Sequence, residues 1–155
     1  MKKLFLLIAL AVAGCLGINA ESNIYVFIKS VGNSDIHILV DGKEVADING
    51  PVKKVMQPGW GLEYPLTMLE SCYRKIVVPE EGKVVVSMEG TYKNAMNGNV
   101  SNYKAEFPLD LEDGESYYLE VTNKGLSDVK FKEIKEKDAL KKMKKWVELP
   151  TVTVE

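Results

Sequence analysis

Few side chains in this chain of 155 residues could carry acid–base or nucleophilic chemistry. There is one histidine, His37, and there are two cysteines, Cys15 and Cys72. Nucleophilic catalysis needs a base, most often histidine, within hydrogen-bonding reach of the nucleophile. His37 alternates with Ile36 and Ile38 along a predicted strand, so its ring lies on the opposite strand face. We expect it to be an exposed or hydrogen-bonded strand residue, and we predict no catalytic residue.

The sequence also lacks the usual ligand sets of metal and cofactor sites. One histidine and one cysteine beyond the leader cannot form a structural zinc site. No Asp/Asn run has the spacing of a calcium loop, and no glycine-rich phosphate loop joins a strand to a helix. Acidic residues at 80–81 and 110–115 fall at predicted hairpin tips, where solubility and turn formation explain them better than a glycosidase cleft. We therefore predict no metal, no cofactor and no enzymatic activity.

The first 20 residues have the layout of an export signal. Lys2 and Lys3 precede an uninterrupted apolar run of nine residues, 4–12, and two small residues follow the run. The run is well short of the roughly 20 apolar residues that span a bilayer. Positive residues, a short apolar run and small residues in this order are typical of a secretory signal peptide.

Two cleavage sites remain open. The stretch VAGC, residues 12–15, resembles the lipobox of bacterial lipoproteins, in which the cysteine receives the lipid; residues 1–14 would then be removed and Cys15 would be the lipidation site. The stretch INA, residues 18–20, resembles an ordinary signal-peptidase site, which would remove residues 1–20. On the first alternative the N-terminal lipid attaches the protein to a membrane. Either way we expect an extracytoplasmic protein of the bacterial cell envelope, as an outer-membrane lipoprotein or in the periplasm or medium.

The remaining chain suits one domain, which we place at residues 23–149, with a tail at 150–155 that adds an edge strand or lies loose. Without Lys2 and Lys3 it carries 18 basic and 22 acidic side chains, which provides no electrostatic reason to bind nucleic acid. Cys72 has no cysteine partner on either cleavage alternative. We expect it to be a small buried apolar residue in a fold that depends on its hydrophobic core.

Period-two patterns predict a mainly β fold. The predicted strands cover residues 23–30, 73–78, 83–89, 103–111, 116–122 and 128–134, together with a hairpin at 36–48. Asp41 and Gly42 suit the type I′ turn of that hairpin, which needs positive φ at both central residues. Pro108 indicates an edge strand or a bulge. We predict an antiparallel β-sandwich, immunoglobulin-like or transthyretin-like, of about seven to nine strands, with a small barrel as the alternative.

Three segments depart from this pattern. Residues 49–71 contain three prolines and three glycines, and we expect a long connection with one short strand at 64–69. Trp60 and Tyr64 in this segment are candidate binding residues that could stack on a sugar or a partner chain; the alternative is that Trp60 plugs one end of the sandwich. Residues 90–102 predict a polar loop. Residues 136–147 predict a C-terminal amphipathic helix, with a lysine face that is solvated or lies on anionic lipid.

The hairpin ILVDGKEVADINGP, residues 38–51, resembles the V-D-G-K-x-V hairpin of PEGA-type bacterial envelope modules. The stretch LDLEDGESYYLEVTNKG, residues 109–125, is similar to a strand pair found in exported β-sandwich families of unknown function. These families are secreted or lipid-anchored and have no assigned activity. The resemblance implies an envelope location and a non-catalytic module, and it supplies no catalytic residues.

Together these patterns predict an exported, lipid-anchored envelope protein that acts as a non-catalytic binding or structural module. Its partner would be an envelope protein or a glycan. The alternative is a secreted inhibitor or an accessory subunit that presents one loop, 57–65 or 90–102, to an envelope enzyme or assembly.

Overall fold

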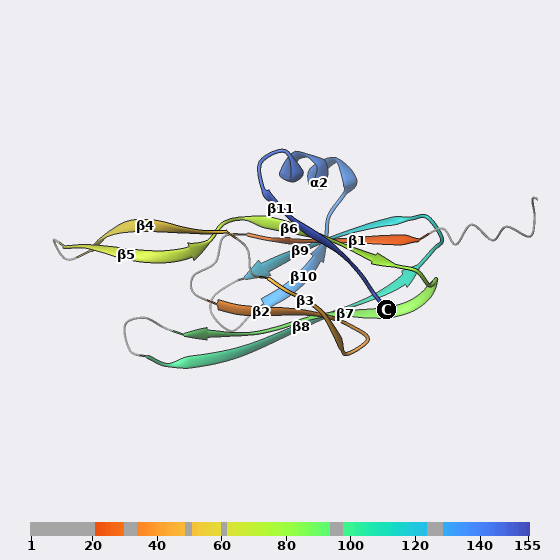
Figure 1. The fold of residues 1–155 in the computed structure, drawn as a ribbon, viewed down its shortest axis with the longest axis horizontal. Coiled ribbons are helices and arrows are strands. Elements are labelled where there is room, and N and C mark those ends of the chain that lie inside the picture. Colours follow the sequence, from red (N-terminus) through yellow and green to blue (C-terminus); the bar gives the residue numbers. More distant parts are fainter. Residues whose placement is uncertain (1–20, 30–33, 49–50, 60–61, 94–97, 124–128) are drawn as a thin grey trace, which may run out of the picture.

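A computed structural model describes residues 21–29, 34–48, 51–59, 62–93, 98–123 and 129–155. These residues form eleven strands and one short helix (Figure 1). In chain order the elements are β1 (Ser22–Ile28), β2 (Ser34–Val40), β3 (Lys43–Asp47), β4 (Val52–Gly59), β5 (Leu62–Leu69), β6 (Cys72–Val78), β7 (Gly82–Lys93), β8 (Val100–Leu111), β9 (Ser116–Asn123), β10 (Val129–Glu133), α2 (Glu136–Met143) and β11 (Val147–Thr153). The prediction of a mainly β protein with one helix is confirmed.

Nine of the strands form two sheets. The first has the order β10-β9-β1-β6-β11, and the second has the order β3-β2-β7-β8. Every neighbouring pair of the second sheet is antiparallel. In the first sheet β1 pairs with β9 in parallel, and β6 pairs with β11 in parallel. The prediction of a wholly antiparallel arrangement is therefore wrong for the first sheet, because β9 and β11 reach their partners through long connections rather than hairpins.

One hydrophobic core lies between the two sheets. Its largest fully buried side chains include Ile24 and Ile28 from β1, Ile38 from β2 and Met88 from β7. Alternate residues of each strand point into this layer, so the two sheets share one apolar interior. The predicted burial of Cys72 is confirmed, since its side chain joins this core from β6 with no exposed surface.

The helix covers the outer face of the five-stranded sheet (Figure 1). Ala139 is fully buried against Phe27 and Tyr73, and the Phe27 ring meets Trp146 edge-on at 6.0 Å between centroids. The helix is shorter than the predicted 136–147. It ends at Met143 because the chain turns, and the Val147 amide then donates a hydrogen bond of 3.0 Å to the Ser71 carbonyl as β11 joins β6. The predicted tail at 150–155 continues this edge strand to Thr153.

The proline-rich segment forms a hairpin, β4–β5, rather than the predicted connection with one short strand. Its two strands pair without interruption from Val52 opposite Leu69 to Gly59 opposite Leu62. Pro58 and Pro65 fit because a two-stranded sheet consists of edge strands, where a missing amide can face outward. The hairpin extends away from the two larger sheets at one end of the molecule (Figure 1).

One turn prediction and one edge prediction are confirmed, and one loop prediction is wrong. Asp41 and Gly42 have φ of 50° and 78°, as the predicted type I′ turn requires. Pro108 lies in β8, which is an edge strand of its sheet. The loop expected at 90–102 is shorter, because β7 and β8 pair as far as Lys93 opposite Val100. In the described part of the chain, no helix has the length and apolar character needed to cross a membrane.

Candidate functional site

A row of ionisable side chains crosses the outer face of the four-stranded sheet. The strand register aligns Asp47 of β3, His37 of β2, Glu89 of β7 and Lys104 of β8. The side chains at these paired positions share one face, because residues directly opposite each other in a sheet point the same way. The prediction that His37 lies on the face opposite to Ile36 is confirmed: the isoleucine is buried, and the His37 side chain is 33% exposed.

An irregularity in β3 brings a second carboxylate to the histidine. Asp47 pairs with His37 and Ala46 with Ile38, but the next pair is Glu44 with Leu39, so Val45 is an extra residue. In a regular strand, residues 44 and 47 would point to opposite faces, since successive side chains alternate. The bulge at Val45 turns Glu44 to the same face as Asp47, which is the re-aiming effect that bulges have in many sheets.

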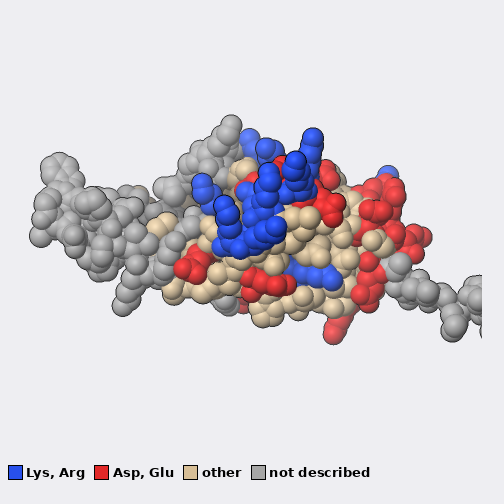
Figure 2. All heavy atoms as spheres, turned by 90° about the horizontal axis from the view of Figure 1, so that it is seen from above, with Lys and Arg blue, Asp and Glu red and all other residues tan. Residues whose placement is uncertain are grey.

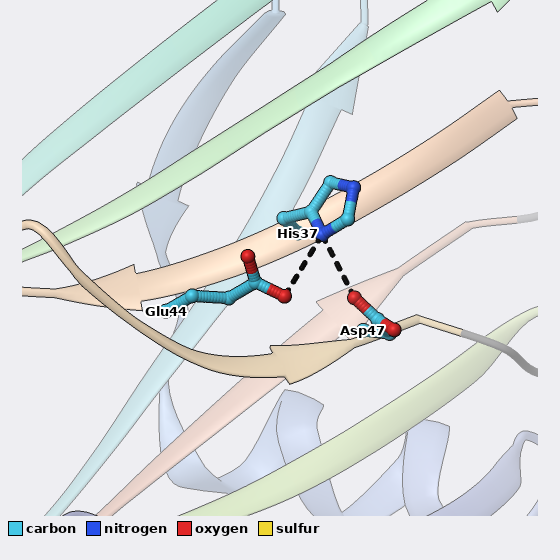
Figure 3. A group of neighbouring side chains, drawn as sticks. All are labelled: His37, Glu44 and Asp47. Atoms are coloured by element: carbon cyan, nitrogen blue, oxygen red, sulfur yellow. Dashed lines mark hydrogen bonds and ion pairs between the residues drawn. The ribbon is translucent and has the colours of Figure 1, made fainter.

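The two carboxylates converge on one ring nitrogen of His37 (Figure 3). Nδ1 lies 3.0 Å from Oε1 of Glu44 and 2.8 Å from Oδ1 of Asp47. On the other side of the ring, Nε2 lies 3.5 Å from Oδ2 of Asp35. One imidazole therefore faces three carboxylates, all of them exposed to solvent.

The hydrogen bond with Glu44 raises the pKa of His37 above its usual value, and burial, the next largest effect, opposes this increase. The nearby charges of Glu44 and Asp35 add to the increase, because negative charge favours the protonated ring. Lys104, also on this face, contacts Glu89 and Glu106 at 3.0 Å each, and these contacts raise its pKa.

A shallow depression of about 520 Å³ lies beside the histidine on the same face. Asp35, His37 and Glu89 line one part of it, and Asn102 and Lys104 line another. This open depression exposes the Asp35 side of the imidazole to solvent. It lacks the apolar enclosure that is typical of small-molecule sites.

The described residues place the imidazole and the thiol far apart in the fold. Cys72 points into the core from the five-stranded sheet, whereas His37 is on the outer face of the other sheet. Burial raises the pKa of the Cys72 thiol to about 11, and the Arg74 charge opposes this shift. At neutral pH the thiol is therefore protonated, and a protonated thiol is a poor nucleophile.

Three residues singled out in the sequence cannot be placed in the same way. Cys15 and Trp60 lie outside the described residues. Tyr64 lies in β5 opposite Gln57, and its backbone position in the projecting hairpin is all that the structure describes. Their predicted roles in lipidation and binding stay predictions.

The lysine face of the terminal helix forms the main basic patch in the view from above (Figure 2). Its exposed members are Lys137, Lys141, Lys144 and Lys145. Lys142 differs from them, because its ammonium lies 2.6 Å from Glu120 and 4.7 Å from the Trp146 ring centroid. It secures the helix to the sheet and is not part of the exposed patch.

Glu44 and Asp47 were not predicted from the sequence as neighbours of His37. The Asp41–Gly42 turn predicts the hairpin and therefore places β3 beside β2. The bulge decides which β3 side chains face outward, and the alternation of the sequence alone does not reveal it.

Comparisons with known proteins provide no family for this chain. No protein-family model matches it. No curated protein and no solved structure matches it either.

Proposed function

We propose that this chain is an exported, lipid-anchored protein of the bacterial cell envelope that acts as a non-catalytic binding module. Its signal-like leader and the lipobox-like stretch ending at Cys15 support the location. The projecting β4–β5 hairpin is the observation that carries the binding role. Of the two candidate binding residues, Tyr64 lies in β5, and Trp60 follows β4 in the sequence.

The surroundings of the Cys72 thiol and the His37 imidazole are consistent with a non-catalytic module. The Cys72 thiol is buried and protonated, and the His37 imidazole lies among carboxylates on another sheet. Nucleophile and base would have to be within about 3 Å for the usual catalytic pairing. The described residues contain no such pair of histidine and cysteine.

We assign the two-sheet arrangement to the immunoglobulin-like or transthyretin-like sandwiches. Tyr117 supports this assignment, since its hydroxyl donates to the Asp110 carbonyl at 2.9 Å and accepts from the Glu112 amide at 2.8 Å. A tyrosine near the start of a strand that bonds back to the preceding backbone is the tyrosine corner of such sandwiches. The parallel pairs of β9 and β11 make this chain a variant of that arrangement.

The binding role is tested by photo-crosslinking in the producing bacterium. A photoreactive phenylalanine analogue at Tyr64 should form a discrete adduct with one envelope component. The same analogue at Lys83, an exposed residue of β7, serves as the matched control. Equal adducts from both positions, or none from Tyr64, would count against the hairpin as a binding element.

The second candidate is an inhibitor or accessory subunit that presents a loop to an envelope enzyme or assembly. The long β7–β8 hairpin favours it, since its strands pair from Gly82 opposite Leu111 to Lys93 opposite Val100. A crosslink from Asn99 to an enzyme, together with loss of that enzyme's activity, would favour this alternative over the first.

A further inference from the structure

We propose that His37, Glu44 and Asp47 form a binding site for one divalent transition-metal ion, with Zn²⁺ the best-suited ion. The three side chains offer one imidazole nitrogen and two carboxylate oxygens, and these atoms all lie within 4.8 Å of one another. Imidazole and carboxylate are both established zinc ligands. The mixture of one nitrogen and two oxygens is less suited to Mg²⁺ or Ca²⁺, which prefer oxygen alone.

The spacing around Nδ1 is close to that of adjacent ligands of one ion. In a tetrahedral site, ligand atoms on bonds of about 2.1 Å are about 3.4 Å apart. The separations of Nδ1 from Glu44 and Asp47 are 3.0 Å and 2.8 Å, so each exposed carboxylate would need to move outward by about half an ångström. Both oxygens approach the same nitrogen from β3 (Figure 3), so an ion between them would contact all three ligands.

A proton serves this geometry less well than a metal ion does. Nδ1 can carry one hydrogen, and hydrogen bonds weaken steeply when they depart from linearity. One N–H cannot point along the line to Glu44 and along the line to Asp47 at the same time. A dication bonds to all three atoms and neutralises both carboxylates.

The far side of the imidazole shows a second feature of a metal-binding histidine. In most such sites the non-ligating ring nitrogen donates to a carboxylate or a carbonyl, which fixes the tautomer and orients the ring. Oδ2 of Asp35 lies 3.5 Å from Nε2 of His37. With an ion bound at Nδ1, the ring hydrogen would lie on Nε2, and this contact would orient the imidazole toward the ion.

The backbone around the ligands is held from two directions. The bulge at Val45 sets the orientation of Glu44. On the other side of β3, the Asp47 carbonyl accepts a hydrogen bond of 2.9 Å from the buried Arg74 guanidinium. The ligands are exposed to solvent, so an ion can enter directly, and water would complete its coordination.

The test is titration of the full chain with ZnCl₂, in a Cys15→Ser background in which the buried Cys72 is the one remaining cysteine. Calorimetry should show one Zn²⁺ bound per chain. Mn²⁺ should bind more weakly, in line with the order of stabilities for such ligands. In amide spectra, Mn²⁺ should broaden the signals of residues around His37 first, and a tenfold excess of Mg²⁺ should leave them unchanged.

Substitutions then assign the ligands. His37→Asn and Asp47→Asn should each lower the affinity for Zn²⁺ at least about tenfold, and Glu44→Gln is a third, nearly isosteric variant in case one of them fails to fold. Asp35→Asn should lower the affinity for Zn²⁺ about tenfold, because the Asp35 carboxylate orients the imidazole ring. Glu106→Gln on the same face removes an equal charge outside the cluster and should leave the affinity unchanged.

Three results would overturn the proposal. Absence of Zn²⁺ binding would make the cluster an ion-paired imidazole only. Binding that survives His37→Asn and Glu44→Gln would place the ion elsewhere. Equal losses from Glu106→Gln and Asp47→Asn would reduce the effect to general surface charge.

Discussion

Nη2 of Arg74 donates a hydrogen bond of 2.9 Å to the backbone carbonyl of Asp47, whose carboxylate faces His37 on the other side of β3. Nη1 of the same guanidinium donates a bond of 2.8 Å to the Pro150 carbonyl in β11. Arg74 is 8% exposed and points inward from β6. One side chain therefore joins β3 and β11, the edge strands of the two sheets, and supports the backbone of the proposed metal ligand.

Replacing Arg74 should loosen this edge. Arg74→Met removes both donors and leaves the carbonyls of Asp47 and Pro150 without them, at a cost of about 1–3 kcal/mol for a buried unsatisfied group. Burial lowers the pKa of Arg74, so its removal also recovers some desolvation cost, and the net loss should be about 2 kcal/mol. Denaturant unfolding of Arg74→Met and wild type measures this loss of stability. Lys75→Met, on the opposite face of β6, should change stability by less than about 0.5 kcal/mol; equal effects would refute the edge contact.

The Cys72 thiol should make stability depend on alkaline pH. Burial raises its pKa from 9.0 to about 11, so the folded state keeps the proton more strongly than the unfolded chain does. This stabilising contribution is complete below about pH 9 and is lost as the pH rises toward 11. With about 1.4 kcal/mol for each pH unit, the loss is about 2–3 kcal/mol.

Cys72→Ala isolates this effect, because the tyrosines and lysines titrate alike in both proteins. The stability difference between wild type and Cys72→Ala, from urea unfolding, should fall by about 2–3 kcal/mol from pH 8 to pH 11. In the folded protein, the Cys72 thiol should also resist labelling by thiol reagents at pH 8. A pH-independent difference, or rapid labelling of Cys72 in the native state, would show that the thiol is accessible.

Gly90 should not tolerate a side chain. A Cβ atom at this position would collide with the backbone oxygen of Asp35 and with the hydroxyl of Tyr103. The backbone atom cannot move without shifting β2, so Gly90→Ala should cost about 2–3 kcal/mol. In Gly98→Ala the new atom meets open space, and the φ of 70° alone should cost about 1 kcal/mol. Thermal unfolding of both variants checks the ranking, which the reverse order would contradict.

Because α2 covers the sheet, substitutions at neighbouring helix residues should have contrasting effects on stability. Ala139 is fully buried against Phe27 and Tyr73, so Ala139→Leu should overpack this contact and cost about 1–3 kcal/mol. Leu140 is 48% exposed, and Leu140→Ala should change stability by less than about 0.5 kcal/mol. Denaturant midpoints measure both changes. A larger loss at Leu140 would mean that the helix packs through another face.

The sequence predicted most of the strands, because the period-two alternation that indicates a strand lies within the strand itself. The alternation in 36–48 and the Asp41–Gly42 pair specify a hairpin without any distant contact. Pairing between distant strands was not predictable. Nothing near Val147 indicates that the chain will leave the helix to join β6 in parallel.

The candidate site shows the same limit. The position of His37 on the outer strand face follows from the isoleucines that flank it. The approach of Glu44 and Asp47 depends on one extra residue in β3, and the sequence has no marker for that bulge. The β4–β5 hairpin was missed for a related reason, since its prolines favour a loop until the pairing of two edge strands is known.

The mass of the mature protein, isolated from the bacterial envelope, tests the proposed envelope role most directly. We expect a chain that starts at Cys15 and carries a diacylglyceryl-type mass increment; a chain that starts at Glu21 would retain export but exclude the lipid anchor. Recovery of the intact chain, with Met1 and residues 2–20 still present, from the cytoplasmic fraction would contradict the account.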